Sequence, residues 1–106
     1  MFMSAPETQN GQGRQSVAVL ELLVKNHPGV MSHVCGLFSR RAYNLEGIAV
    51  LPVGDGSLSR IWLKVAEESR LEQIVKQLQK LPDIRQVDRH EGAHSVFTEM
   101  AHYFTL

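Results

Sequence analysis

Hydrophobic residues in the first half of the chain change their spacing once, and the change predicts a strand followed by a helix. Residues 17–25 are β-branched and leucine-rich and are nearly apolar on both faces, which is typical of a central strand. Residues 26–29 interrupt this run, and Pro28 suits a first helical turn because the N–H that it lacks would have no partner there. From residue 30 the apolar positions recur with helical spacing, and they are Val30, Met31, Val34, Leu37, Phe38 and Ala42.

The next part of the chain predicts two strands, a helix and a final strand. Residues 44–53 are apolar from Ile48 onward and predict a strand that ends near Pro52, before the Gly-Asp-Gly-Ser turn signal of residues 54–57. Apolar and charged residues then alternate over 60–65, as in a strand with one buried face. Residues 69–72 match a capping box, which predicts a helix that ends at Pro82. Residues 83–89 predict a short last strand.

This order of elements predicts an α+β fold of the ferredoxin-like type. Right-handed crossovers place the βαββαβ elements in a four-stranded antiparallel sheet with both helices on one face, and Trp62 falls on the other face. Residues 1–16 are polar, and we expect them to form a flexible leader ahead of a domain at 17–89. Residues 90–106 contain many apolar side chains, so we expect them to pack on the domain or to dock on a partner.

Composition narrows the function classes. Eleven basic and eleven acidic residues cancel, so the chain lacks the basic field that gives nonspecific affinity for DNA or RNA. Cys35 is the only cysteine, which excludes an internal disulfide and a cysteine zinc cluster. No apolar run is long enough to span a membrane, and residues 1–16 lack the features of a signal peptide. We therefore expect a cytoplasmic protein with no nucleic-acid or membrane partner.

The turn at residues 26–31, between the first strand and the first helix, is the best candidate for a binding site. The first N–H groups of a helix lack intrahelical partners and lie at the positive end of its dipole, so they suit a carboxylate. Gly29 leaves room for a ligand, and the Asn26 amide both donates and accepts hydrogen bonds, as the two charged ends of an amino acid require. The same residues also fit a plain helix start in which Asn26 or His27 is the N-cap and nothing binds.

The run Asn-His-Pro-Gly-Val-Met at residues 26–31 resembles the ligand turn of ACT domains, which bind amino acids between paired protomers. The longer run over 26–52, above all residues 33–48, resembles the small subunit of acetolactate synthase, and similar residues at 59–62 and 71–74 extend the resemblance over about 17–89. The chain differs from longer members of this family in lacking their second, C-terminal domain. It also has Ala42 and Gly47 where they commonly have glycine and serine, and both differences resemble the short, valine-responsive type.

The resemblance implies a non-catalytic regulatory subunit that binds valine or another branched-chain amino acid. Such a subunit is a homodimer that activates the catalytic large subunit of acetolactate synthase and mediates feedback inhibition. Thiamin diphosphate, magnesium and FAD belong to the catalytic subunit in this family, so no cofactor is expected in this chain. The residues implied to contact the ligand are Asn26, Gly29, Val30 and Met31 of one protomer, through the N–H groups of the last two, and Asn44, Leu45 and Ile48 of its neighbour.

Three other interpretations were weighed against this one. A free-standing ACT protein that regulates a different enzyme would carry the same turn. A ferredoxin-like enzyme such as an acylphosphatase needs an arginine in the first strand-to-helix loop to hold phosphate, and residues 26–29 contain none. His90 and His94, with Glu91 and His102 nearby, are possible metal ligands, but a solvated polar tail is the favoured interpretation because no second clear ligand pair supports a metal. No catalytic or metal-binding residue is therefore predicted.

Overall fold

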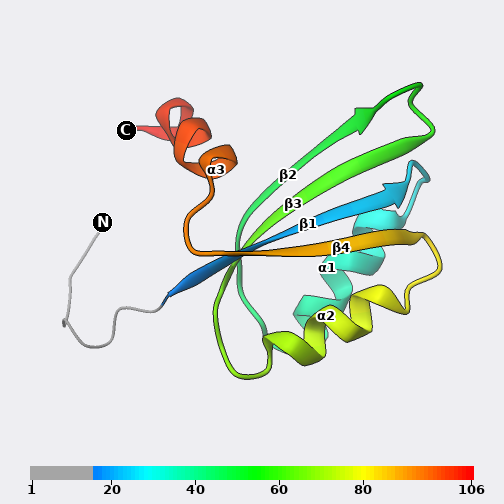
Figure 1. The fold of residues 1–106 in the computed structure, drawn as a ribbon, viewed down its shortest axis with the longest axis horizontal. Coiled ribbons are helices and arrows are strands. Elements are labelled where there is room, and N and C mark those ends of the chain that lie inside the picture. Colours follow the sequence, from blue (N-terminus) through cyan, green and yellow to red (C-terminus); the bar gives the residue numbers. More distant parts are fainter. Residues whose placement is uncertain (1–15) are drawn as a thin grey trace.

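The computed structural model describes residues 16–106 and confirms the ferredoxin-like fold (Figure 1). Its antiparallel sheet has the strand order β2-β3-β1-β4, so β1 and β3 are central. The strands are β1 (Val17–Lys25), β2 (Leu45–Val53), β3 (Leu58–Ala66) and β4 (Ile84–Glu91). The predicted leader lies outside the described residues except for Ser16, and it stays a prediction.

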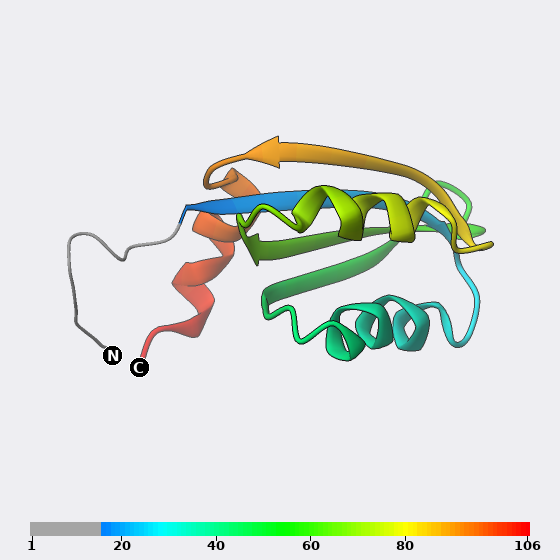
Figure 2. The ribbon, with the colours of Figure 1, turned by 90° about the horizontal axis from the view of Figure 1, so that it is seen from below.

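The two ends of the sheet carry different parts of the chain (Figure 2). β1 ends at the turn that leads into α1 (Val30–Arg40), whereas the other end of the sheet carries the residues that follow β4. β4 continues two residues beyond the predicted strand and ends at Glu91. After it, residues 92–106, which we call the C-terminal segment, form the short helix α3 (Ser95–Met100) and the 3-10 helix η1 (Ala101–Phe104).

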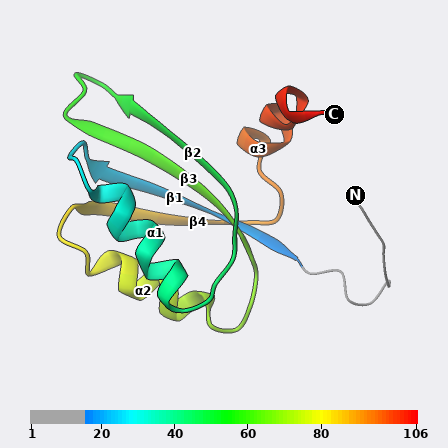
Figure 3. The ribbon, with the colours of Figure 1, turned by 180° about the vertical axis from the view of Figure 1, so that it is seen from behind.

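Both long helices, α1 and α2 (Leu71–Gln79), lie on one face of the sheet, as Figure 3 shows. Alternate residues of the central strands point toward these helices. In the sheet register Leu20 pairs with Leu63 and Leu22 pairs with Ile61, so these side chains lie on the same face. The helices contribute one apolar stripe each, which confirms the predicted helical periodicity except at Ala42, which lies beyond the end of α1 and is exposed. The largest fully buried side chains of this core include Leu20, Leu22, Ile61, Leu63, Val34, Phe38, Leu71, Ile74 and Leu78.

The opposite face of the sheet, which we call the open face, is partly covered by the C-terminal segment. Phe97 of α3 packs against Gly47 at the start of β2, where a Cβ atom would lie 2.8 Å from Phe97 Cε1. Val19 on this face is fully buried. Tyr103 and Phe104, in contrast, are 86% and 74% exposed. None of the helices among residues 16–106 is long and apolar enough to cross a membrane.

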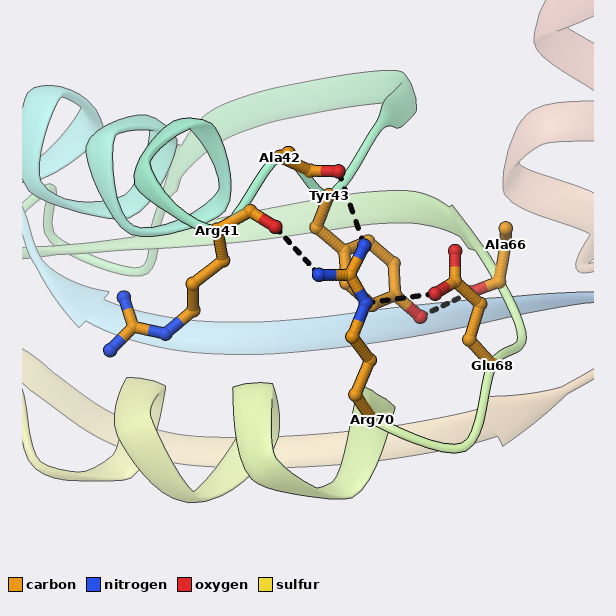
Figure 4. Close-up of polar contacts among 6 residues, drawn as sticks. All are labelled: Arg41, Ala42, Tyr43, Ala66, Glu68 and Arg70. Atoms are coloured by element: carbon orange, nitrogen blue, oxygen red, sulfur yellow. Dashed lines mark hydrogen bonds and ion pairs between the residues drawn. The ribbon is translucent and has the colours of Figure 1, made fainter.

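The predicted capping box at the start of α2 is wrong. The helix begins at Leu71 with Arg70 as its N-cap, and no side chain caps it. Arg70 instead reaches across to the end of α1, where its Nη1 donates to the Arg41 carbonyl at 2.6 Å and its Nη2 donates to the Ala42 carbonyl at 3.2 Å (Figure 4). Its Nε also donates to Glu68 at 2.9 Å. The guanidinium thus satisfies helix-end carbonyls of α1 and ties the two helices together.

Tyr43 lies beneath this guanidinium, which is 4.9 Å from the centre of its ring. The phenol is buried and donates to the Ala66 carbonyl of β3 (Figure 4). Burial, with a further contribution from the negative charge of Glu68, raises the pKa of Tyr43 above its usual value. The hydroxyl therefore keeps its proton and holds the end of α1 on the sheet.

Ala42 precedes Tyr43 with a φ of 51°, in the left-handed region. The left-handed region destabilises a residue that has a Cβ atom by about 1–2 kcal/mol. Glycine avoids this strain, but its greater freedom in the unfolded chain lowers the free energy of unfolding by about 0.4–1 kcal/mol. We therefore expect Ala42→Gly to raise the free energy of unfolding by up to about 1 kcal/mol, measured by urea denaturation. The matched control is Ala49→Gly within β2, which should lower it by about 0.5–1 kcal/mol. Equal effects of both substitutions would contradict the assigned strain.

Candidate functional site

The turn between β1 and α1 is held in place from two sides. The Asn26 backbone N–H donates to the Ser57 carbonyl at 2.9 Å, and its side-chain Nδ2 donates to the Gly56 carbonyl at 2.8 Å, so the turn is fixed to the β2–β3 hairpin. On the other side, His27 Nδ1 lies 3.6 Å from Asp83 Oδ2, just before β4. The Asn26 amide therefore uses one of its donors, and among residues 16–106 its side-chain oxygen has no donor partner.

The start of α1 differs from the simple helix start that the sequence also allowed. The N-cap is Gly29, with a φ of 95°, and no side chain caps the helix, so neither Asn26 nor His27 has that role. The Val30 N–H, which the sequence assigned to the ligand, donates instead to the His27 carbonyl at 3.2 Å. Among the described residues, the N–H groups of Met31 and Ser32 have no backbone acceptor. Sequence reasoning missed Ser32, which only the hydrogen bonding of the turn reveals.

These free N–H groups lie at the positive end of α1, whose first turn contains no acidic residue. Beside them is a cavity of about 60 Å³. That volume is well below the roughly 300–1,000 Å³ of typical small-molecule sites. The turn therefore has donors for a carboxylate beside a cavity too small to enclose a small molecule by itself. The cavity is lined by Val24, Lys25, Asn26, His27, Val30, Met31, Val50, Ser59 and Ile61.

Asn44, Leu45 and Ile48 lie away from this turn within the protomer. The turn follows the end of β1, where Val24 pairs with Ser59, which in turn pairs with Pro52 near the end of β2. Leu45 begins β2, seven residues before Pro52, and is about 23 Å away at the usual rise per residue of a strand. The folded chain thus brings together Asn26, Val30 and Met31. The three residues that the resemblance assigns to a neighbouring protomer lie apart from them.

A second cluster of polar and aromatic side chains lies on the open face. The rings of His90 and His94 lie 5.6 and 4.6 Å from that of Trp62, and His90 Nε2 lies 2.9 Å from Glu21 Oε1. His94 is also the N-cap of α3, since its Nδ1 accepts from the Val96 N–H at 3.1 Å. These two histidines therefore join the C-terminal segment to the sheet.

Metal binding finds no support in this cluster. Among residues 16–106, no group of three or more histidine, cysteine, aspartate or glutamate side chains is arranged to hold a metal ion. The sequence favoured a solvated tail for these histidines. In the structure His94 instead packs on Trp62, and His90 pairs with Glu21. The sequence could have indicated the position of His90. If the last predicted strand is extended by two residues, His90 lies opposite Val19 on the open face.

Comparison with known proteins adds independent information. The profile described as "AHAS small subunit-like ACT domain" matches residues 20–86. The acetolactate synthase isozyme 1 small subunit of Escherichia coli K12 is 51% identical over 86 residues, which are 81% of this chain and 90% of that protein. The isozyme 3 small subunit of the same organism is 46% identical over 78 residues, which are 72% of this chain and 48% of that protein.

A solved structure shows a similar arrangement of elements. The acetolactate synthase small subunit of Thermotoga maritima superposes with a TM-score of 0.63 at 36% identity. The match covers 69% of this chain and 46% of that one. Sequence and structure comparisons therefore agree on the same family, and the profile match over residues 20–86 includes the β1–α1 turn.

Proposed function

The chain belongs to the family of AHAS small subunit-like ACT domains, and on that basis we propose that it binds valine between two protomers and regulates the catalytic subunit of acetolactate synthase. The observation that carries the proposal is the pair of free N–H groups, on Met31 and Ser32, at an uncompensated helix start. The valine carboxylate would accept from these groups. The Asn26 side-chain oxygen is an acceptor for the ammonium, and Val50 and Ile61 supply apolar wall.

The remaining wall of the pocket would come from a second protomer. β2 is an edge strand whose outer side pairs with no strand among the described residues, and Ile48 and Val50 are exposed on it. Antiparallel pairing of two β2 strands about a two-fold axis near Ala49 would bring the partner's Leu45 beside Val53. The start of one β2 strand, with Asn44, Leu45 and Ile48, would then lie near the turn of the other protomer.

Regulation requires that valine favour one arrangement of the complex over another, because only differential affinity shifts an equilibrium. A ligand shared by two protomers meets this condition, since its binding stabilises one relative position of them. We place the catalytic chemistry, with its thiamin diphosphate, magnesium and FAD, in the large subunit. This chain would act on that chemistry only through contacts between the subunits.

The C-terminal segment is our candidate for part of that contact. Tyr103 is 86% exposed and Leu106 is fully exposed, although both are large apolar side chains. They lie beyond α3, whose Phe97 fixes the segment to the open face. Clustered exposed apolar side chains on a small domain are typical of a protein interface.

Dimer formation and valine binding are tested together by sedimentation and calorimetry. We expect a concentration-dependent homodimer whose melting temperature rises by several degrees in valine, because a ligand at a hundred times its Kd stabilises the bound state by about 2.7 kcal/mol. Val50→Lys should weaken the dimer by placing a charge on the β2 edge, whereas Gln73→Lys adds the same charge on α2, away from it. A monomer at high concentration, with or without valine, would contradict the proposed interface.

A further inference from the structure

A cavity of about 320 Å³ lies between the C-terminal segment and the start of β2, far from the β1–α1 turn. Its volume is within the range of small-molecule sites, at the lower end, which suits one metabolite-sized ligand. It exists only because α3 and η1 fold back against the sheet, since four of its lining residues come from them. The lining residues are Glu46, Gly47, Ile48, Lys64, Phe97, Met100, Ala101 and Phe104.

The cavity combines an apolar wall with one positive and one negative group. Phe97, Met100 and Phe104 supply most of the apolar wall. Glu46 and Lys64 line the same space, and within residues 16–106 neither forms an ion pair or a side-chain hydrogen bond with another residue. A carboxylate and an ammonium that face a shared cavity without internal partners are available to a ligand of complementary charge.

The depth of the cavity depends on a contact that only glycine permits. A Cβ atom at Gly47 would lie 2.8 Å from Phe97 Cε1, so any larger residue would push α3 outward. The segment is also held three residues earlier, where His94 packs on Trp62 and caps α3. A ligand that contacts both Lys64 of the sheet and Phe97 of α3 would therefore strengthen the attachment of the segment.

We propose that this cavity is a second small-molecule site, which takes a zwitterion with an apolar body, such as an aliphatic or aromatic amino acid. The ligand carboxylate pairs with Lys64, its ammonium pairs with Glu46, and its side chain lies against Phe97, Met100 and Phe104. Occupancy holds the C-terminal segment on the sheet. The site is distinct from the proposed valine site. Gly47 and Lys64 pair on the open face of the sheet, whereas Val50 and Ile61, which line the cavity beside the turn, pair on the face that the helices cover.

Trp62 provides the readout, because it is the only tryptophan and it stacks on the N-cap of α3. The full chain is titrated with L-leucine, N-acetyl-L-leucine and L-leucine amide while Trp62 fluorescence is followed. We expect a saturable change with leucine, and about tenfold weaker binding of each derivative, since each lacks one of the two charges. No saturable change with leucine up to its solubility limit would overturn the proposal.

Two variants assign the response to the cavity. Lys64→Met should weaken leucine binding about tenfold but leave the affinity for leucine amide nearly unchanged, because that probe has no carboxylate. Lys76→Met removes the same charge from the exposed side of α2 and should change neither. Circular dichroism confirms that each variant is folded. Equal effects of Lys64→Met on both probes would overturn the assigned charge pairing.

Gly29→Asp separates this site from the proposed valine site. The Trp62 response to leucine should persist in this variant, because Gly29 is the N-cap of α1, on the helix-covered side of the sheet, whereas Lys64 and Trp62 lie on the open face. A response that disappears in Gly29→Asp but survives Lys64→Met would place the ligand at the turn and overturn the second site. A persistent Trp62 response without any valine binding at the turn would overturn the proposed function and leave the second site standing.

Discussion

A Gly29→Asp variant is expected to bind valine about a thousandfold more weakly than the unaltered chain. If the valine carboxylate accepts from the Met31 and Ser32 N–H groups, the new carboxylate lies about 4 Å from it, and the two repel by about 4 kcal/mol at an effective dielectric constant near 20. Each 1.4 kcal/mol corresponds to about a tenfold change in affinity. Calorimetric titration measures the loss directly. In the assembled enzyme, the variant should support activity that valine no longer inhibits.

Gly29→Asn is the matched control for charge. Gly29 has a φ of 95°, so both substitutions carry the same backbone strain, and nothing lies within 4 Å of an added Cβ atom. Asparagine and aspartate tolerate this region better than most residues, so both variants should fold. The asparagine variant should retain most of its valine affinity because it adds no charge. A folded Gly29→Asp variant with unchanged affinity would falsify the proposed site.

Asn26→Ala is a less specific test than the sequence alone would indicate. Its side chain donates to the Gly56 carbonyl at 2.8 Å and holds the turn against the β2–β3 hairpin. Truncation removes this bond together with any bond to the ligand. A loss of valine binding in Asn26→Ala therefore does not distinguish a ligand contact from a displaced turn, whereas the pair of Gly29 variants does.

The double substitution Tyr103→Ser and Leu106→Ser is expected to weaken association with the catalytic subunit by about a hundredfold or more. Truncation of a hot-spot side chain at the centre of an interface costs about 2 kcal/mol or more. Two such losses correspond to more than two orders of magnitude in Kd. Titration of the catalytic subunit with the chain, followed by the rise in acetolactate formation, gives the apparent Kd. Valine binding should stay nearly unchanged, because the turn lies at the other end of the sheet.

His102→Ser is the control for this pair, since it alters an exposed polar side chain next to Tyr103 in η1. It should have little effect on association. Deleting residues 93–106 is a cruder test, because it also uncovers Val19 and Gly47 on the open face. Undiminished association of the double variant would rule out these side chains as the docking anchor.

Local patterns in the sequence were sufficient to predict the order of the elements and the position of the turn. The spacing of apolar residues in β1 and α1 reports which side of each element is buried, and that information lies within a few consecutive residues. Pro28 and Gly29 mark the turn in the same local way. The tertiary structure therefore changed the ends of the elements from β1 to β4 by only a few residues, but it added α3 and η1, which the sequence had not predicted.

Contacts between distant residues decided what the local patterns could not. The predicted capping box is absent because α2 begins at Leu71 with Arg70, not Ser69, as its N-cap. The Arg70 guanidinium instead donates to the carbonyls of Arg41 and Ala42, 29 and 28 residues earlier. Gly47 accommodates Phe97 because a side chain is missing at one position, and a missing side chain has no periodic signature. The sequence by itself thus determined the elements and the family, since both follow from residues in order along the chain. Only the folded structure decided which helix-start donors stay free and where the C-terminal segment encloses a cavity, because these depend on side chains that meet across the sheet.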